Sequence, residues 1–222
     1  MSVTMPAPTS VADLWQRATD LCGWRLGDLA EELEVPIPPS NLYGKGWAGQ
    51  LVERALGVRA NSDAEADFVE FGIELKTVPL SLTGEPLEST YVTRVPMHDL
   101  ARETWENSSL RNKLMKILWI PLIGPRGGPL PDRTIGRAQL WTPSAEQELM
   151  IQADWRDLLE LVRMGQSEDL HGRLGVCLQV RPKGANARAR VKGVDGEGFS
   201  AQVAPLGFYL RPNFVAEILR AK

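Results

Sequence analysis

The chain has 222 residues, of which 43% are hydrophobic and 24% are charged, and its formal net charge is −3. This length suits one large domain or two lobes, and the composition is ordinary for a globular protein. Two cysteines and two histidines are too few for a disulfide framework or a histidine-rich zinc site. No apolar run approaches the roughly 20 residues of a membrane span, and the first residues lack the features of a signal peptide. We therefore expect a cytoplasmic protein with no membrane association.

The first part of the chain is predicted to form three helices, because apolar residues recur there at helical spacing. They cover residues 11–21, 26–33 and 46–56. Ser10 is the expected N-cap of the first helix and Gly57 the expected C-cap of the third. The proline-rich segment 35–40 ends the second helix, since proline cannot continue one.

The segment 68–78 is predicted to be one strand, with Asp67 just ahead of it. Side chains alternate along a strand, so Glu74 and Lys76 should point the same way. Residues 81–86 have the composition of a turn, and 89–95 of a returning strand. The whole of 67–95 is therefore predicted to be a hairpin.

The rest of the chain mixes strands and helices. Strands are predicted at 114–123, 138–141, 174–180 and 208–210, and helices at 142–164 and 212–222. This order, together with the hairpin, predicts an α/β or α+β class with a mixed sheet.

Charge is segregated along the sequence. Residues 61–75 contain five acids and no base, whereas residues 181–192 contain five bases and no acid. An acidic cluster suits a metal ion and a basic segment suits phosphates, so a slightly acidic protein can still bind DNA locally.

The spacing Asp67, Glu74, Lys76 resembles a signature of metal-dependent nucleases. Two carboxylates can hold Mg²⁺ beside a scissile phosphate, and a neighbouring lysine can lower the pKa of the attacking water. The alternative is a solvated ion pair on an exposed strand. Glu53, on the preceding helix, is either a third carboxylate of this site or a surface residue paired with Arg54 or Arg59.

Three further basic segments are candidates for phosphate contact. Lys45 precedes Gly46 and Trp47 at a helix N-terminus, where free backbone N–H groups favour anions; the alternative is a simple helix start. Residues 181–183 begin a basic loop in which small residues separate the charged ones; the alternative is a mobile basic loop with no role in binding. Arg111, Lys113 and Lys116 form the third patch.

Several spaced blocks together resemble the MutH family of DNA mismatch repair endonucleases, in the order of the family and over nearly the whole chain. These blocks are 45–47, 51–53, 66–68, 72–79, 84–90, 118–121, 179–183 and 207–211. The resemblance implies a restriction-endonuclease-like fold, with two lobes around a DNA-binding cleft. It implies one domain over 1–222, with a catalytic lobe at about 10–95 and a DNA-recognition lobe at about 110–222.

The resemblance also implies an activity and partners. These are Mg²⁺-dependent nicking of the unmethylated strand, 5′ of the guanine, at hemimethylated GATC sites in double-stranded DNA. Activation by MutL, once MutS has found a mismatch, and a monomeric state follow from it as well. Two alternatives stay open, namely a dimeric restriction endonuclease of the same fold and a catalytically inactive DNA-binding adaptor.

The resemblance also implies roles for individual residues, by their positions in the matching blocks. The catalytic set is Glu53, Asp67, Glu74, Lys76 and Lys113, with Asp67 and Glu74 as metal ligands. The residues for DNA contact and methylation sensing are Lys45, Tyr91, Arg181, Pro182, Lys183 and Tyr209. Tyr209 is the expected methyl sensor. The sequence departs from the family pattern at Tyr91, where a phenylalanine is expected, at Ala66, where a proline is expected, and across 97–104 and 188–200.

Overall fold

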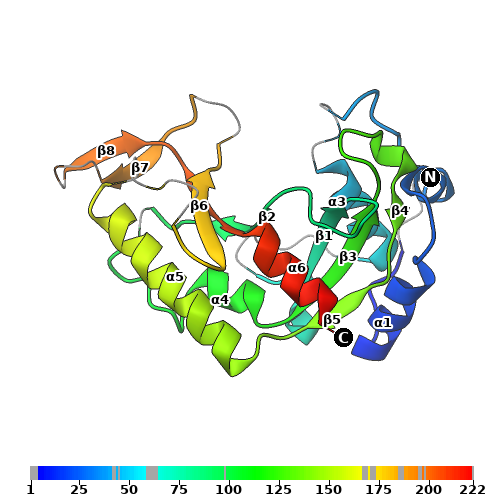
Figure 1. Ribbon diagram of the computed structural model, residues 1–222, viewed down its shortest axis with the longest axis horizontal. Helices are drawn as coiled ribbons and strands as arrows, with labels where there is room; N and C mark the ends of the chain where they lie inside the picture. The colour runs from blue at the N-terminus through cyan, green and yellow to red at the C-terminus, as the bar shows by residue number, and fades with distance from the viewer. Residues whose placement is uncertain are drawn as a thin grey trace. The chain divides into compact units, whose positions relative to one another are not determined.

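The computed structural model describes residues 5–41, 44, 46–58, 65–97, 99–166, 170, 174–184, 188–194, 197 and 199–221 (Figure 1). The chain divides into two compact units, each made of two separate segments. The first unit comprises Met1–Glu88 and Lys116–Trp141, and the second comprises Ser89–Met115 and Thr142–Lys222. The structure defines the geometry within each unit.

Over the residues that the structure describes, the first unit carries three helices, two 3-10 turns and a four-stranded sheet. Its elements are α1 (Val11–Asp20), α2 (Leu26–Glu32), α3 (Trp47–Leu56), η1 (Val69–Phe71), β1 (Glu74–Leu80), β3 (Ile117–Ile123), η2 (Leu130–Asp132), β4 (Thr134–Ile135) and β5 (Gln139–Trp141). The three predicted helices are confirmed. Gly57 has φ of 76° at the C-cap of α3, a left-handed conformation that glycine adopts without steric cost.

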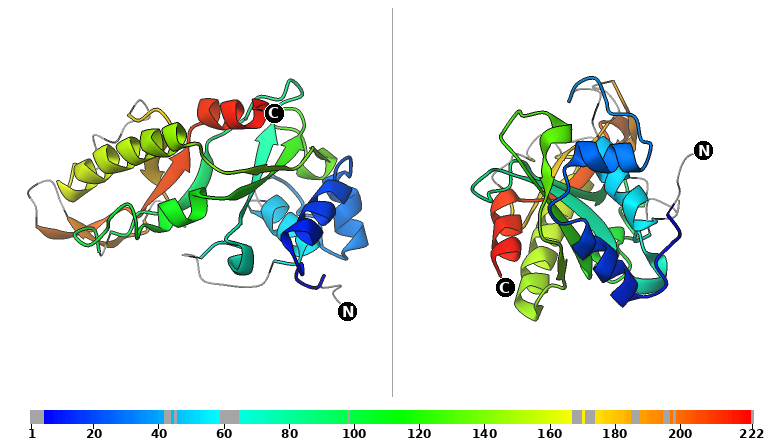
Figure 2. Two further views of the ribbon diagram at one scale, coloured as in Figure 1. Left: turned by 90° about the horizontal axis from the view of Figure 1, so that it is seen from below. Right: turned by 90° about the vertical axis from the view of Figure 1, so that its right-hand side faces the viewer.

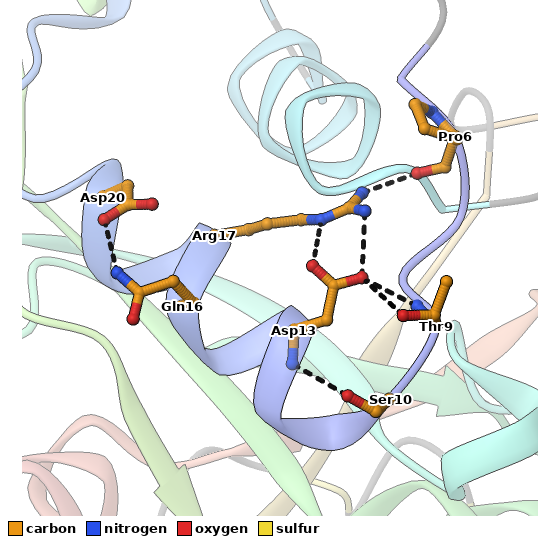
Figure 3. Close-up of polar contacts among 7 residues, drawn as sticks. All are labelled: Pro6, Thr9, Ser10, Asp13, Gln16, Arg17 and Asp20. Carbon is orange, nitrogen blue, oxygen red and sulfur yellow. Dashed lines mark hydrogen bonds and ion pairs between the residues drawn. The ribbon is translucent and has the colours of Figure 1, made fainter.

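The start of α1 is fixed by a set of polar contacts (Figure 3). The hydroxyl of Ser10 accepts a hydrogen bond from the backbone N–H of Asp13, as predicted for an N-cap. The Asp13 carboxylate in turn accepts from the Arg17 guanidinium and from Thr9. Its bond to Arg17 holds the pKa of Asp13 below its usual value. Arg17 also donates to the carbonyl of Pro6, which ties the preceding segment to the helix.

The sheet of the first unit is mixed. β1 and β3 are parallel, with Glu74 opposite Ile117 and Lys76 opposite Trp119. β4 and β5 both run antiparallel to β3. The predicted hairpin over 67–95 is therefore wrong, because the partner of β1 is β3 and the returning segment pairs in the other unit. A parallel pair needs a long crossover, and here the chain between β1 and β3 passes through the second unit.

The predicted strand 68–78 is also wrong in its first half. Val69–Phe71 form a 3-10 turn, and Gly72 follows it with φ of 61°. Such a left-handed residue cannot continue an extended strand. β1 accordingly begins at Glu74.

The core of the first unit lies between its sheet and its helices. Leu75 of β1 and Ile120 of β3 pack with Leu14 of α1, Leu29 of α2 and Leu51 of α3. In Figure 1, α3 runs beside β1. The apolar stripes that predicted the three helices are thus the surfaces that cover one face of β1 and β3.

In its described residues, the second unit contains a three-stranded antiparallel sheet, a two-stranded hairpin and three helices. Its elements are β2 (Thr90–Arg94), α4 (Ser109–Leu114), α5 (Ala145–Arg163), β6 (Leu178–Pro182), β7 (Val191–Val194), β8 (Ser200–Val203), β9 (Leu206–Leu210) and α6 (Pro212–Arg220). The strand order is β2-β9-β6, and β7 pairs with β8. α4 packs against β2 and α5 against β6 (Figure 2).

Two more element predictions need correction. The strand predicted at 114–123 begins only at Ile117, because Leu114 still belongs to helix α4. The strand predicted at 174–180 begins at Leu178. By contrast, the long helix α5 is confirmed, and Ser144 and Gln147 form a capping box at its start. The mixed α/β class is confirmed as well.

Across the part of the chain that the structure describes, none of the helices has the length and apolar character to span a bilayer.

Candidate functional site

The first residues of β1 form a buried ion pair. The Nζ atom of Lys76 lies 2.6 Å from Oε1 of Glu74. The Glu74 side chain is 1% exposed and that of Lys76 15%. The predicted common direction of the two side chains is confirmed, but the exposed, solvated pair is not what the structure contains. A carboxylate this deeply buried needs a partner, because an isolated charge is costly away from water.

Asp67 reaches the same strand through a hydrogen bond to its backbone. Oδ2 of Asp67 accepts from the N–H of Leu75 at 2.8 Å. The chain folds back between them, since Phe68 and Ile73 exchange backbone hydrogen bonds of 2.9 and 3.2 Å around the turn. In a continuous strand, the seven positions from Asp67 to Glu74 would span roughly 23 Å. The turn is therefore what brings the Asp67 carboxylate to the residue next to Glu74.

Glu53 approaches β1 from α3, and it does so on the side of the strand where Thr77 lies. A Cβ atom added to Gly49 would lie 3.9 Å from Oε1 of Glu53 and 3.7 Å from Oγ1 of Thr77. Thr77 alternates with Lys76 along the strand, so its side chain belongs to the opposite face. Glu53 is half-buried on α3 and its carboxylate lies on the Thr77 side of β1.

The chemistry of these side chains fits a hard cation. Carboxylate oxygens are the ligands that Mg²⁺ takes in proteins, and it is commonly held by one or two carboxylates together with waters and substrate phosphates. Glu74 is the first residue of β1, and the Asp67 carboxylate is bonded to the backbone of Leu75 beside it, so the start of this strand carries two carboxylates. Among the residues that the structure describes, no three His, Cys, Asp or Glu side chains gather as a metal-holding group.

A second group of predicted residues gathers on the sheet of the second unit. Tyr91 of β2 lies opposite Tyr209 of β9, and their rings meet edge to face with centroids 5.4 Å apart. The guanidinium of Arg181 lies 5.8 Å from the centre of the Tyr209 ring. Nζ of Lys183 lies 4.1 Å from the centre of the Tyr91 ring. Two cations thus lie over two rings, which are geometries that attract electrostatically.

This group, which we call the ring–cation cluster (Tyr91, Arg181, Lys183 and Tyr209), depends on a residue for which the sequence predicted no role. Gly207 of β9 lies opposite Arg181. A Cβ atom there would lie 3.0 Å from Cε2 of Tyr91 and 3.1 Å from Cβ of Lys183. The predicted strand began only at residue 208, so this glycine was not expected inside a strand, where a glycine often marks close approach of another group to the backbone.

The other predicted residues lie as follows. Pro182 is exposed at the end of β6, opposite Leu206. Lys113 is a residue of α4 in the second unit and is 7% exposed. Lys45 lies outside the described residues. The structure therefore assembles Glu53, Asp67, Glu74 and Lys76 around one strand of the first unit, and the ring–cation cluster on one sheet of the second.

Comparison with known proteins identifies the family. Residues 56–154 match the family model described as "MutH: DNA mismatch repair enzyme MutH". A DNA mismatch repair protein MutH from Pasteurella multocida (strain Pm70) is 46% identical over 213 residues, which cover 96% of this chain and 96% of that protein. One from Haemophilus influenzae (strain PittGG) is 45% identical, again with 96% of each chain covered.

A third relative, a DNA mismatch repair protein MutH from Vibrio cholerae serotype O1 (strain ATCC 39541 / Classical Ogawa 395 / O395), is 44% identical over 97% of both chains. Identity at this level over nearly the full length covers both units, including the strand with Glu74 and Lys76 and the sheet with Tyr209. The chain belongs to the MutH family and is a DNA mismatch repair endonuclease.

Proposed function

We propose that this protein is a Mg²⁺-dependent endonuclease that nicks the unmethylated strand of double-stranded DNA at hemimethylated GATC sites, 5′ of the guanine. It would act in the cytoplasm, as a monomer, in methyl-directed mismatch repair, with MutL as its direct partner and MutS acting through MutL. The observation that carries the proposal is the placing of Asp67, Glu74 and Lys76 around the first residues of β1. The restriction-endonuclease-like fold, with DNA between two lobes, stays a prediction.

Asp67 and Glu74 would hold the metal ion. When bound, Mg²⁺ supplies charge for the phosphodiester transition state and lowers the pKa of a bound water. Lys76 already neutralises the Glu74 carboxylate across 2.6 Å. Once Mg²⁺ also neutralises the Glu74 carboxylate, the Lys76 ammonium would be free to contact the incoming phosphate or the attacking water. Glu53 would belong to the catalytic set from the Thr77 side of β1, and Lys113 would supply a positive charge near the scissile phosphate.

The ring–cation cluster is the proposed reading surface for the DNA sequence. Arginine suits guanine, because its planar fork donates two hydrogen bonds to O6 and N7. Arg181 also donates to the hydroxyl of Ser89 at 3.0 Å, which holds the guanidinium within the second unit. Lys45, Pro182 and Lys183 would contact the backbone or base edges beside it.

Tyr209 is the proposed methyl sensor, and Tyr91 supports its ring edge to face. We expect Tyr209→Ser to lower the preference for hemimethylated over fully methylated duplexes. A ring against adenine N6 discriminates by contact and hydrogen bonding, worth roughly 1–3 kcal/mol. The measurement is the ratio of nicking rates on the two substrates. An unchanged ratio would remove Tyr209 from this role.

Gly207 offers a test of the cluster as a unit. In Gly207→Ala the new methyl group would meet Tyr91 and Lys183 at 3.0 and 3.1 Å, so both side chains must shift by a few tenths of an ångström. Displacing positioned groups lowers the reaction rates that depend on their geometry, so we expect Gly207→Ala to prefer GATC over altered sites less strongly than the wild type does. Gly193→Ala in the β7–β8 hairpin is the control for mere crowding, because its methyl group would meet Val203 instead. Equal selectivity in Gly207→Ala and the wild type would contradict the assignment.

The experiment that tests the proposed function uses a supercoiled plasmid with hemimethylated GATC sites, with and without Mg²⁺ and with and without MutL. We expect an open-circular product that requires the metal. A linear product would indicate a dimeric enzyme that cuts both strands, and no product under any condition would indicate a DNA-binding adaptor. Sedimentation of the same sample separates the monomer from the dimer.

A further inference from the structure

A carboxylate on the apolar side of α5 holds the beginning of β6. Asp154 is 8% exposed, although it lies among the buried residues Ile151, Trp155 and Leu158 of that helix. Its Oδ2 atom accepts hydrogen bonds from the backbone N–H groups of Val176 at 2.8 Å, Cys177 at 2.6 Å and Leu178 at 2.8 Å. Oδ1 accepts from Val176 at 3.0 Å. Three consecutive backbone donors thus converge on one buried charge.

The carbonyl groups of the same segment are held from the other side by Arg211, which follows β9. Nη1 of Arg211 donates to the carbonyls of Leu174 and Gly175 at 2.9 and 3.1 Å. The backbone N–H of Arg211 donates to the carbonyl of Cys177 at 2.8 Å. The Asp154 carboxylate therefore binds N–H groups of segment 174–178, and the Arg211 guanidinium binds two of its carbonyl groups. Each charged group thus has the kind of hydrogen-bond partner that it favours.

The backbone of this segment has little freedom to move. Gly175 has φ of 80°, and a Cβ atom there would lie 2.3 Å from the carbonyl oxygen of Leu178 and 3.2 Å from the Asp154 carboxylate. Cys177 is fully buried, and burial followed by the charge of Asp154 raises the pKa of its thiol to about 12. The segment is a tight turn whose backbone closes around the carboxylate, with Cys177 and Leu178 buried.

This turn leads into β6 beside the end of β9, and these two strands carry residues of the proposed reading surface. β6 begins at Leu178 and carries Arg181, whereas β9 carries Tyr209 and ends at Leu210, one residue before Arg211. The pairing places Gln179 opposite Tyr209 and Arg181 opposite Gly207. Because a slip of one residue turns every side chain of a strand to the other face, the register decides whether Arg181 meets the Tyr209 ring.

The structure assigns Asp154 as a positioning residue for DNA recognition, which fixes β6 against β9 so that Arg181 and Tyr209 share one surface. Asp154 touches neither DNA nor metal in this role and acts through Arg181. The assignment rests on the proposed function in one respect, namely that Arg181 reads the DNA. A helix residue with no other task on an apolar stripe would be aliphatic, and the aspartate is explained by the three N–H groups that it accepts.

The test compares Asp154→Asn with Asp157→Asn in the full-length protein. Both changes remove one carboxylate charge from α5, but Asp157 is 72% exposed and pairs with its neighbour Arg156. The first readout is the ratio of single-turnover nicking rates on a hemimethylated GATC duplex and on duplexes with one base pair of the site changed. The second readout is hydrogen exchange of the backbone amides of residues 176–182.

In Asp154→Asn we expect the ratio to fall by about tenfold, which corresponds to the loss of one charge-assisted hydrogen bond. Exchange in 176–182 should become faster in the same variant. Asp157→Asn should match the wild type in both readouts. A merely structural role would lower the amount of active protein and all rates alike, which leaves the ratio unchanged. Faster exchange with an unchanged ratio, or unchanged exchange, would overturn the assignment.

Two further variants keep the test decisive. Arg181→Ala measures base reading directly, so an unchanged ratio of nicking rates in this variant contradicts the proposed function of Arg181. If the ratio collapses in Arg181→Ala but stays normal in Asp154→Asn, only the positioning role of Asp154 is contradicted. If Asp154→Asn does not fold, Arg211→Lys removes the two-carbonyl contact from the opposite side of the same turn. It should lower the ratio as well, and a wild-type ratio in Arg211→Lys would overturn the assignment.

Discussion

The Lys76→Ala variant should lose nicking activity by about 10²–10⁴-fold, the range found when a positioned proton-transfer group is removed. Its ammonium is held 2.6 Å from the Glu74 carboxylate and is 15% exposed, so it is placed with little freedom beside the proposed metal ligand. The measurement is the single-turnover nicking rate on a hemimethylated GATC duplex at saturating enzyme. Binding to the same duplex in Ca²⁺ should change much less, because a single lysine is only one of many phosphate contacts.

The same change should also destabilise the protein, since it leaves Glu74 buried at 1% exposure without this cation. Breaking a buried pair from one side costs about 3–5 kcal/mol. The double variant Glu74→Gln with Lys76→Met removes both charges, so we expect it to recover much of the unfolding free energy while nicking stays lost. If the double variant recovered nicking together with stability, the pair would be a structural element and not a catalytic one.

The second large effect is expected for Asp67→Asn. Asparagine keeps an oxygen that can accept the N–H of Leu75, so the turn should persist, but the negative charge is gone. A metal ion contributes several kcal/mol to its transition state, and each 1.36 kcal/mol is tenfold in rate. We therefore expect a loss on the order of 10³-fold in nicking, read as product per minute at fixed Mg²⁺.

Raising the Mg²⁺ concentration should restore part of the activity of Asp67→Asn, because a weakened metal site fills at higher concentration. The matched control is Glu70→Gln, which removes a charge from the exposed 3-10 turn only three residues away. It should nick at the rate of the wild type. Equal losses in both variants would mean that the acidic segment acts by its overall charge and holds no defined metal ligand.

Helices α1, α2, α3, α5 and α6 were predictable from the sequence, because their apolar residues recur at helical spacing, whereas the short α4 was not predicted. α5 is the clearest example, with its apolar stripe and its Ser144 cap. The same reasoning failed at 67–95, where the partners of a strand are far away in sequence. β1 pairs with β3 and β2 with β9, and no local pattern reports such pairings.

The site residues Asp67 and Glu74 were predicted on the wrong backbone, and their roles stay a prediction. An extended segment would have kept Asp67 and Glu74 roughly 23 Å apart, so one continuous strand was incompatible with a shared metal ion. Gly72 was the residue that could have signalled the turn. Asp154 was passed over for a similar reason, since an aspartate on an apolar helix face has no local explanation until β6 lies beside it.

The proposed activity is strand-selective, metal-dependent nicking by the residues around β1. Its most direct test uses one GATC duplex with a different label on each strand, methylated on either strand in turn, with Mg²⁺ and MutL present. We expect one cut, 5′ of the guanine, always in the strand without the methyl group, and no cut in Asp67→Asn on the same time scale. Cutting of both strands, cutting that ignores the methyl group, or full activity of Asp67→Asn would contradict it.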